Sequence, residues 1–158
     1  AIHGAQPTTL RFMRNLMNNT FRAQCHCGQL SIRFSQAPVA QLVCHCRDCQ
    51  AVSGMTYAKA AFFKAEEQCA QGEFVAVDMT GGSGKPKQYR RCRQCNDFVY
   101  ATVDALTGLL GVAADRLGPP FEFQPMAHVW TSEKAPEVDI PQGVFQFPKA
   151  PPFRPGKQ

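Results

Sequence analysis

Apolar and polar residues alternate over several short stretches of this chain, and Gly or Pro residues separate many of these stretches. A period of two places successive side chains on opposite faces of a β-strand. The pattern therefore predicts a mainly β, mostly antiparallel domain. Strands are expected over residues 30–34, 57–63, 74–78, 87–91, 98–102 and 126–131.

Two other segments have signals of their own. A short helix is expected over residues 47–52, because Gly54 follows where glycine commonly ends a helix. Residues 104–117 fit a helix or a loop. The stretch from Gly81 to Gly84 predicts a flexible turn rather than a phosphate-binding loop, since no Gly-Lys-Ser/Thr follows it at the required spacing.

The composition fits one globular domain, with 158 residues of which 44% are apolar. We expect an N-terminal extension over residues 1–19, a folded domain over 20–147 and a Pro-rich C-terminal tail over 148–158. No stretch approaches the roughly 20 apolar residues of a membrane span, and residues 1–19 lack the apolar core of a secretory signal. A cytoplasmic protein is therefore expected, and whether residues 1–19 are native or processed stays open.

The formal charge of +5 is unevenly distributed. The segment from Asp48 to Asp139 contains 9 basic and 12 acidic residues, a net charge of −3, so the positive excess belongs to the flanks. Basic flanks can favour nucleic acid or another anion. We interpret these flanks as solvated and expect no nucleic-acid partner.

Seven of the eight cysteines fall into three tight clusters, which indicates a metal or redox role. The clusters are C25-x-C27, C44-x-C46-x-x-C49 and C92-x-x-C95. A disulfide framework is disfavoured by the absence of a secretory signal and by the awkward C-x-C span. A thioredoxin-like motif would need a βαβ context, which the strand pattern does not supply.

Zinc explains the clusters best, because it takes about four soft ligands in a tetrahedron. Two pairs from distant segments make one closed, structural site, and three thiolates within six residues leave a fourth position for water or substrate. The closed site would use Cys25, Cys27, Cys92 and Cys95, and the open, catalytic one Cys44, Cys46 and Cys49. Two zinc ions per chain are expected, although spacing alone does not exclude iron.

The neighbours of these cysteines refine the prediction. Gly28 and Asn96 each follow a cluster and tolerate the positive φ that turns amides toward sulfur. His26 and His45 are interpreted as non-ligands, because the middle side chain of an extended C-x-C segment points the opposite way. His45 is nevertheless a candidate proton carrier beside the open site. Cys69 is isolated and is expected to be a small buried residue.

With these motifs the chain resembles the glutathione-dependent formaldehyde-activating enzyme family, a module also found in centromere protein V. The resemblance extends from about Thr20 to Phe147 and rests on CHCG at 25–28, CHCRDC at 44–49, Ser53-Gly54, Gly72, C92-x-x-C95 and His128 before SEKAP. It implies a fold similar to Mss4-like β domains, with the same division into a structural and a catalytic zinc site. Three positions depart from the family pattern, namely Asn96, Glu137 and Cys69.

The resemblance also implies an activity, a carbon–sulfur lyase reaction that joins glutathione to formaldehyde. A site of four thiolates would carry a net charge of −2, so cations nearby would help to offset it. Arg47 and Arg90 are candidates for glutathione's carboxylates, together with Lys85, Lys87, Arg91 and Arg93. A non-catalytic thiol carrier and a zinc-built interaction module stay open as alternatives. The physiological thiol and aldehyde and the oligomeric state also stay open.

Overall fold

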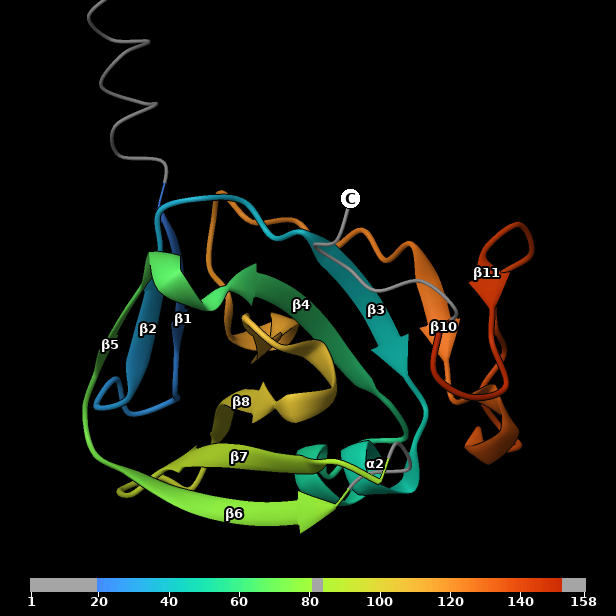
Figure 1. Cartoon of the computed structure of the whole chain (residues 1–158), viewed down its shortest axis with the longest axis horizontal. Coiled ribbons are helices and arrows are strands. Elements are labelled where there is room, and N and C mark those ends of the chain that lie inside the picture. The colour runs from blue at the N-terminus through green and yellow to red at the C-terminus, as the bar shows by residue number, and fades with distance from the viewer. Residues whose placement is uncertain (1–19, 81–83, 152–158) are drawn as a thin grey trace, which may run out of the picture.

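The computed structural model describes residues 20–80 and 84–151, which form two β-sheets and one short α-helix (Figure 1). The predicted extension over 1–19 and most of the turn from Gly81 to Gly84 lie outside the described residues, and the tail is described as far as Pro151. The mainly β fold class is confirmed. Among the described residues, no helix is long and apolar enough to span a bilayer.

The smaller sheet has three antiparallel strands in the order β1-β2-β5. These strands are β1 (Phe21–Gln24), β2 (Ser31–Phe34) and β5 (Gln68–Gln71). The short helix η1 (Ala65–Glu67) precedes β5, and β5 leads directly into β6 of the larger sheet (Figure 1).

The larger sheet has eight strands in the order β11-β10-β3-β4-β9-β8-β7-β6. Its strands are β3 (Ala40–Cys44), β4 (Ala58–Lys64), β6 (Phe74–Thr80), β7 (Pro86–Cys92), β8 (Phe98–Val103), β9 (Leu109–Ala113), β10 (Ala127–Val129) and β11 (Phe145–Gln146). The pairs from β3 to β6 are antiparallel, whereas β10 runs parallel to both β3 and β11. One edge of the sheet is therefore mixed.

The helix α2 (Arg47–Ser53) lies close to its predicted position and ends as expected at Gly54, whose φ of 70° is left-handed. The segment 104–117 is neither a single helix nor a loop. It forms η2 (Asp104–Leu106), β9 and η3 (Ala114–Arg116). Its apolar Leu109–Ala113 stretch pairs with β4, so burial in the sheet decides its conformation. The strand predicted over 126–131 is shorter, because η4 (Thr131–Glu133) begins within it.

Strand β4 separates two apolar cores. Its Phe63 faces the small sheet, where the ring stacks on Phe34 at a centroid distance of 4.1 Å. Phe62, one residue earlier, faces the opposite side and packs with Leu42 and Leu109. Because successive side chains of a strand point to opposite faces, residues 60–63, which contribute to both cores, form a continuous apolar run instead of alternating.

Candidate metal centres

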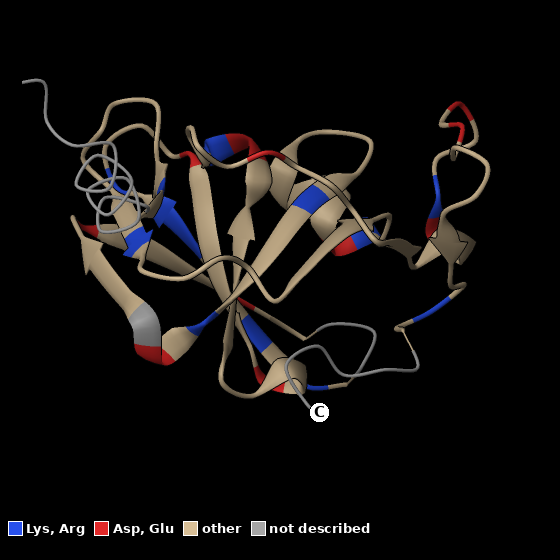
Figure 2. Cartoon of the chain, turned by 90° about the horizontal axis from the view of Figure 1, so that it is seen from above, with Lys and Arg blue, Asp and Glu red and all other residues tan. Residues whose placement is uncertain are grey.

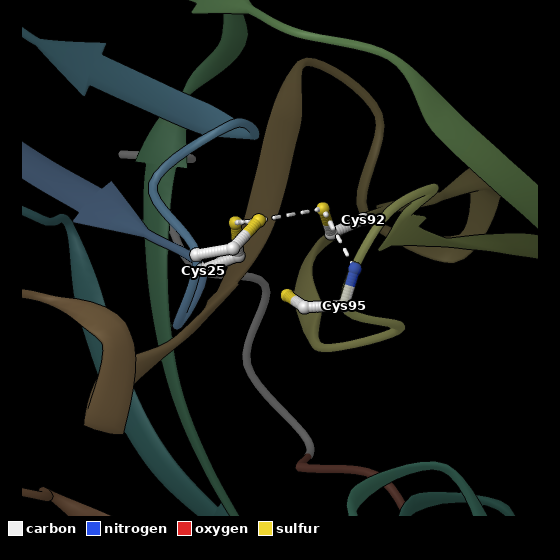
Figure 3. A group of neighbouring side chains, drawn as sticks. Cys25, Cys92 and Cys95 are labelled. Carbon is white, nitrogen blue, oxygen red and sulfur yellow. Dashed lines mark hydrogen bonds between the residues drawn. The ribbon is translucent and has the colours of Figure 1, made fainter.

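Four thiols from two distant loops meet between the sheets. Cys25 and Cys27 follow β1, Cys92 ends β7, and Cys95 lies in the turn before β8. One sulfur from each lies within 4.8 Å of the others, and Figure 3 shows Cys25, Cys92 and Cys95 gathered around one point. The Sγ–Sγ distances from Cys27 to Cys25 and to Cys92 are both 3.6 Å. Such spacing is close to the edge of a tetrahedron with metal–sulfur bonds of about 2.3 Å.

Backbone amides point at these sulfurs. Leu30 N–H donates to Cys25 Sγ at 3.2 Å, and Gln94 N–H donates to Cys92 Sγ at 3.3 Å. Burial acts to raise the pKa of Cys92, but hydrogen bonds from the backbone N–H groups of Cys95 and Gln94 and from the thiols of Cys25 and Cys27 lower it to about 6. Gly28 and Asn96 have the positive φ expected from the sequence, 83° and 65°. The loops are therefore shaped to stabilise thiolates, the form in which cysteine binds a metal.

Asp97 connects the two loops at this site. Its carboxylate accepts a hydrogen bond from the backbone N–H of His26 at 2.6 Å and forms an ion pair with Arg116 at 3.2 Å. The adjacent backbone joins as well, since Cys92 N–H donates to Asp97 O at 2.8 Å. The site is consequently held together by hydrogen bonds in addition to the cysteines.

Three further thiols lie at the start of helix α2. Cys44 ends β3, Cys46 is the N-cap of the helix, and Cys49 is in its first turn, with the three sulfurs within 4.8 Å of one another. Cys49 N–H donates to Cys46 Sγ at 3.2 Å. Among the described residues no fourth Cys, His, Asp or Glu joins this group. The donor set fits a soft divalent ion with one position left for another ligand.

Charge around this second site centres on Lys87. Its ammonium lies 3.2 Å from Asp48, and its side chain is only 13% exposed. Burial lowers the pKa of Lys87, but the negative charges of Cys46, Cys49 and Asp48 raise it more, so the net shift is upward. Hydrogen bonds from Cys44 and Cys49 lower the pKa of Cys46 to about 2. Lys87 is therefore a positive charge that faces Cys46 and Cys49.

A cavity of about 430 Å³ opens beside the three thiols. Its wall comes from β3, β4, β7, β8, β9 and β10 and is mainly apolar, with Trp130 and the chain segment at Ala150 and Pro151 completing it. Lys59, Lys85 and Lys87 also line it, and no carboxylate does so among the described residues.

Tyr89 links this cavity to the thiols. Its hydroxyl lies 3.9 Å from Cys49 Sγ, and its ring lies 5.4 Å from the ammonium of Lys87. Burial, followed by the charges of Cys49 and Cys46, raises the pKa of Tyr89 far above its usual range. Tyr89 is therefore an O–H donor at neutral pH, aimed at the sulfur-lined end of the cavity.

The side chain of His45 points away from those of Cys44 and Cys46, toward His128. Its Nε2 is 2.8 Å from His128 Nδ1, and its ring lies 5.7 Å from that of Tyr57. The side chain is fully buried, and its Nδ1 has no hydrogen-bond partner among the described residues. The cavity lining does not include His45.

The two predicted arginines also lie outside the cavity lining. Arg47 is exposed, and its backbone N–H donates to Glu133. Arg90 lies across the rings of Phe74 and Tyr100, with its guanidinium carbon 4.5 and 5.4 Å from their centroids.

The expectation that Cys69 is buried is wrong. Cys69 is exposed on β5, which pairs with β2 along one side and has all its residues exposed. All eight cysteines are among the described residues, and all eight are free thiols.

The sequence did not predict that Tyr89 and Trp130 line the cavity beside the three thiols. It also did not predict that His128 contacts His45. A signal for Tyr89 existed, because it is two residues from Lys87 on a predicted strand and so shares its face. No local pattern indicates Trp130 or the His45–His128 contact, which joins residues 83 apart.

Comparison with known proteins identifies the family to which this chain belongs. A sequence model described as "Glutathione-dependent formaldehyde-activating enzyme" matches residues 20–133, which include all seven clustered cysteines. No curated protein matches the chain. Among solved structures, a crystal structure of a Rhodobacter sphaeroides protein from structural genomics is 16% identical, with a TM-score of 0.48, and the match covers 80% of this chain and 98% of that one.

Proposed function

Because this chain belongs to the glutathione-dependent formaldehyde-activating enzyme family, we propose that it joins glutathione, or a similar thiol, to formaldehyde or another small aldehyde. The observation that carries the proposal is the group of three thiols, with no fourth protein ligand among the described residues, at the wall of a cavity. In the reaction a bond forms between the thiol sulfur and the carbonyl carbon. The C=O double bond becomes single, and the thiol proton ends on the new hydroxyl.

We propose zinc for both cysteine groups, in a structural role at Cys25, Cys27, Cys92 and Cys95 and a catalytic role at Cys44, Cys46 and Cys49. The all-sulfur donors and the amides that point at them suit this ion. When bound at the three-cysteine group, zinc would lower the pKa of a substrate thiol that takes the fourth position.

Lys87 compensates charge in this proposal. Three protein thiolates and a substrate thiolate around a divalent ion amount to a net charge of −2, which is costly to bury without a counter-charge. The Lys87 ammonium is largely buried beside Cys46 and Cys49, where it offsets part of that charge. Asp48 fixes its position.

Tyr89 supplies the hydrogen-bond donor. An oxygen that gains charge as the sulfur attacks needs a donor placed in advance, and the Tyr89 hydroxyl is at the sulfur-lined end of the cavity. We propose Tyr89 for this role in preference to His45, because the described cavity lining includes Tyr89 and not His45. For the same reason Lys85 is better placed than Arg47 and Arg90 to meet a carboxylate of the thiol.

The alternative of a nucleic-acid-binding module has less support. Over the part of the chain that the structure describes, Figure 2 shows Lys and Arg distributed over several elements with Asp and Glu among them. A nucleic-acid interface generally presents a continuous basic patch.

The test is the formation of S-hydroxymethylglutathione from glutathione and formaldehyde, measured against the spontaneous rate. We expect Cys46→Ser to abolish the acceleration and Tyr89→Phe to reduce it on the order of 100-fold. Tyr57→Phe removes a hydroxyl outside the cavity lining and should keep the wild-type rate. No acceleration by the wild type, with no effect of Cys46→Ser, would contradict the proposal that this protein is an enzyme. Glutathione binding without acceleration would instead identify a thiol carrier.

A further inference from the structure

The cavity beside the three thiols is much larger than formaldehyde requires. Its volume of about 430 Å³ falls in the range of pockets that hold drug-sized ligands. A dry apolar cavity of roughly 150 Å³ already accommodates benzene. A one-carbon aldehyde would therefore leave most of this space unfilled.

The cavity wall is mainly apolar. Leu42, Phe62, Val103, Leu106, Val129 and Trp130 contribute to it. Of the lysines in the lining, Lys59 lies 3.4 Å from Asp115 and Lys87 lies 3.2 Å from Asp48. The described lining offers no carboxylate to an ammonium group.

Glutathione does not match this interior, because it carries two carboxylates and an ammonium. Burying such groups without partners is strongly unfavourable. Lys85 lines the cavity while remaining exposed, so it marks a rim where a carboxylate of the thiol can stay in water. The apolar interior is then left for the other reactant, the aldehyde, whose carbonyl carbon becomes bonded to the sulfur of the substrate thiol and keeps its substituent.

We infer that the aldehyde substrate carries an apolar substituent of roughly five to eight carbons, aliphatic or aromatic, which occupies this cavity. The inference rests on the proposed function and specifies its aldehyde. The bond changes are those of the formaldehyde reaction, with the substituent retained on the carbonyl carbon. Burial of each added methylene is favourable, so affinity should rise with chain length until the cavity is full.

Trp130 provides a direct binding signal, because it lines the cavity and is the only tryptophan in the sequence. The probes are S-methylglutathione and S-hexylglutathione, unreactive thioethers that share one peptide and differ only in the apolar group. Each is titrated into the protein purified with its metals, and Trp130 fluorescence is followed. We expect S-hexylglutathione to bind at least tenfold more tightly. Equal affinity for the two probes would overturn the inference.

Two substitutions test the location. Ala60→Leu on β4 and Ala105→Leu in η2 would fill part of the cavity from two different elements, so one informative variant remains if the other fails to fold. Each should bring the affinity ratio of the two probes toward one. Ala76→Leu, on the exposed strand β6 and outside the lining, is the matched control and should keep the wild-type ratio. An unchanged ratio in a folded Ala60→Leu or Ala105→Leu variant would place the apolar group elsewhere.

Turnover separates this inference from the proposed function. With hexanal as the aldehyde, adduct formation with glutathione should be accelerated at least as much as with formaldehyde. Acceleration with formaldehyde but none with hexanal would overturn the inference and leave the proposed function standing. No acceleration with either aldehyde would overturn the proposed function itself.

Discussion

At the scale of residues, a one-residue offset on β7 decides which side chains reach the sulfur-lined cavity. Lys87 and Tyr89 are two positions apart and both line it. Arg90 has the same sign of charge as Lys87 but points to the opposite face, where its guanidinium lies across Phe74 and Tyr100. A charged residue on a strand can therefore be assigned to the cavity only when it is known which face of the sheet its position points to.

The pair of His45 and His128 makes stability depend on pH. Burial, then the charge of His128, lowers the pKa of His45 from 6.5 to about 4, and burial lowers the pKa of His128 as well. Between pH 6.5 and 4 the unfolded chain therefore binds more protons than the folded one, and stability falls as the pH falls. The contribution is fully present above pH 6.5 and is lost through pH 4.

We predict that His45→Gln reduces the slope of unfolding free energy against pH between pH 6.5 and 4. Urea unfolding at several pH values measures this slope. His26→Gln is the control, because its side chain is exposed and lies outside the buried pair, and it should keep the wild-type slope. Acid also weakens binding at the cysteines, but that effect is common to all three proteins. Equal slopes for His45→Gln and wild type would contradict the prediction.

At the scale of elements, the connection between β5 and β6 has a strict steric requirement. Gly72 joins the two strands with φ of 100°, and a Cβ there would lie 1.9 Å from the backbone oxygen of Gln29. Gln29 is in the loop that follows the first two cysteines, and its side chain donates to Glu73 O. Close contact between these backbones fixes the cysteine loop against the passage from the small sheet to the large one.

We predict that Gly72→Ala destabilises the protein by more than the roughly 1–2 kcal/mol of a left-handed L-residue, because the clashing atom belongs to the backbone and the loop must move. Gly108→Ala is the matched control, since Gly108 also has positive φ, 83°, but has no atom within 4 Å of the added Cβ. It should show the cost of φ alone. Denaturant unfolding of both variants measures the difference, and equal destabilisation would show that the contact with Gln29 is unimportant.

At the scale of the whole molecule, the two cysteine groups differ in how far apart along the chain the segments are that they join. The four-cysteine group joins the β1–β2 loop of the small sheet to the β7–β8 turn of the large sheet. The three-cysteine group is local to the end of β3 and the start of α2. Metal bound at the first group therefore closes a long segment of chain, whereas metal at the second orders a few residues.

We predict that Cys27→Ser and Cys46→Ser each reduce the metal content from two ions per chain to one, but that only Cys27→Ser strongly lowers Tm, by about 10 °C or more. The larger loss follows because binding at a structural site contributes directly to folding. Cys27 is exposed, so the serine buries no new polar group. Serine at position 46 can still cap α2, which should keep the change in Tm below about 5 °C.

Elemental analysis and calorimetry of the two variants provide the measurement. The wild type treated with a strong chelator should resemble Cys27→Ser and lose its cooperative transition near the original Tm. Equal Tm values for the two variants would contradict the division into a structural and a local group. A content of one ion in the wild type would contradict the assignment of two metals.

The sequence by itself determined the features that depend on neighbours along the chain. These are the three cysteine clusters, the positive φ at Gly28 and Asn96, the end of α2 at Gly54 and six of the eleven strands in the described residues. Spacing over a few residues fixes each of them. It also supported the family, because the order of the clusters is a property of the sequence.

Only the tertiary structure decided what surrounds the clustered thiols. The cavity is built from six strands, and the contact of His45 with His128 joins residues 83 apart. Leu109–Ala113 became a strand because β4 and β8 were available on either side. Such features depend on which distant segments pack together, and no local pattern encodes that choice. The sequence could therefore indicate that three thiols leave a ligand position open, but only the fold revealed the apolar space beside it.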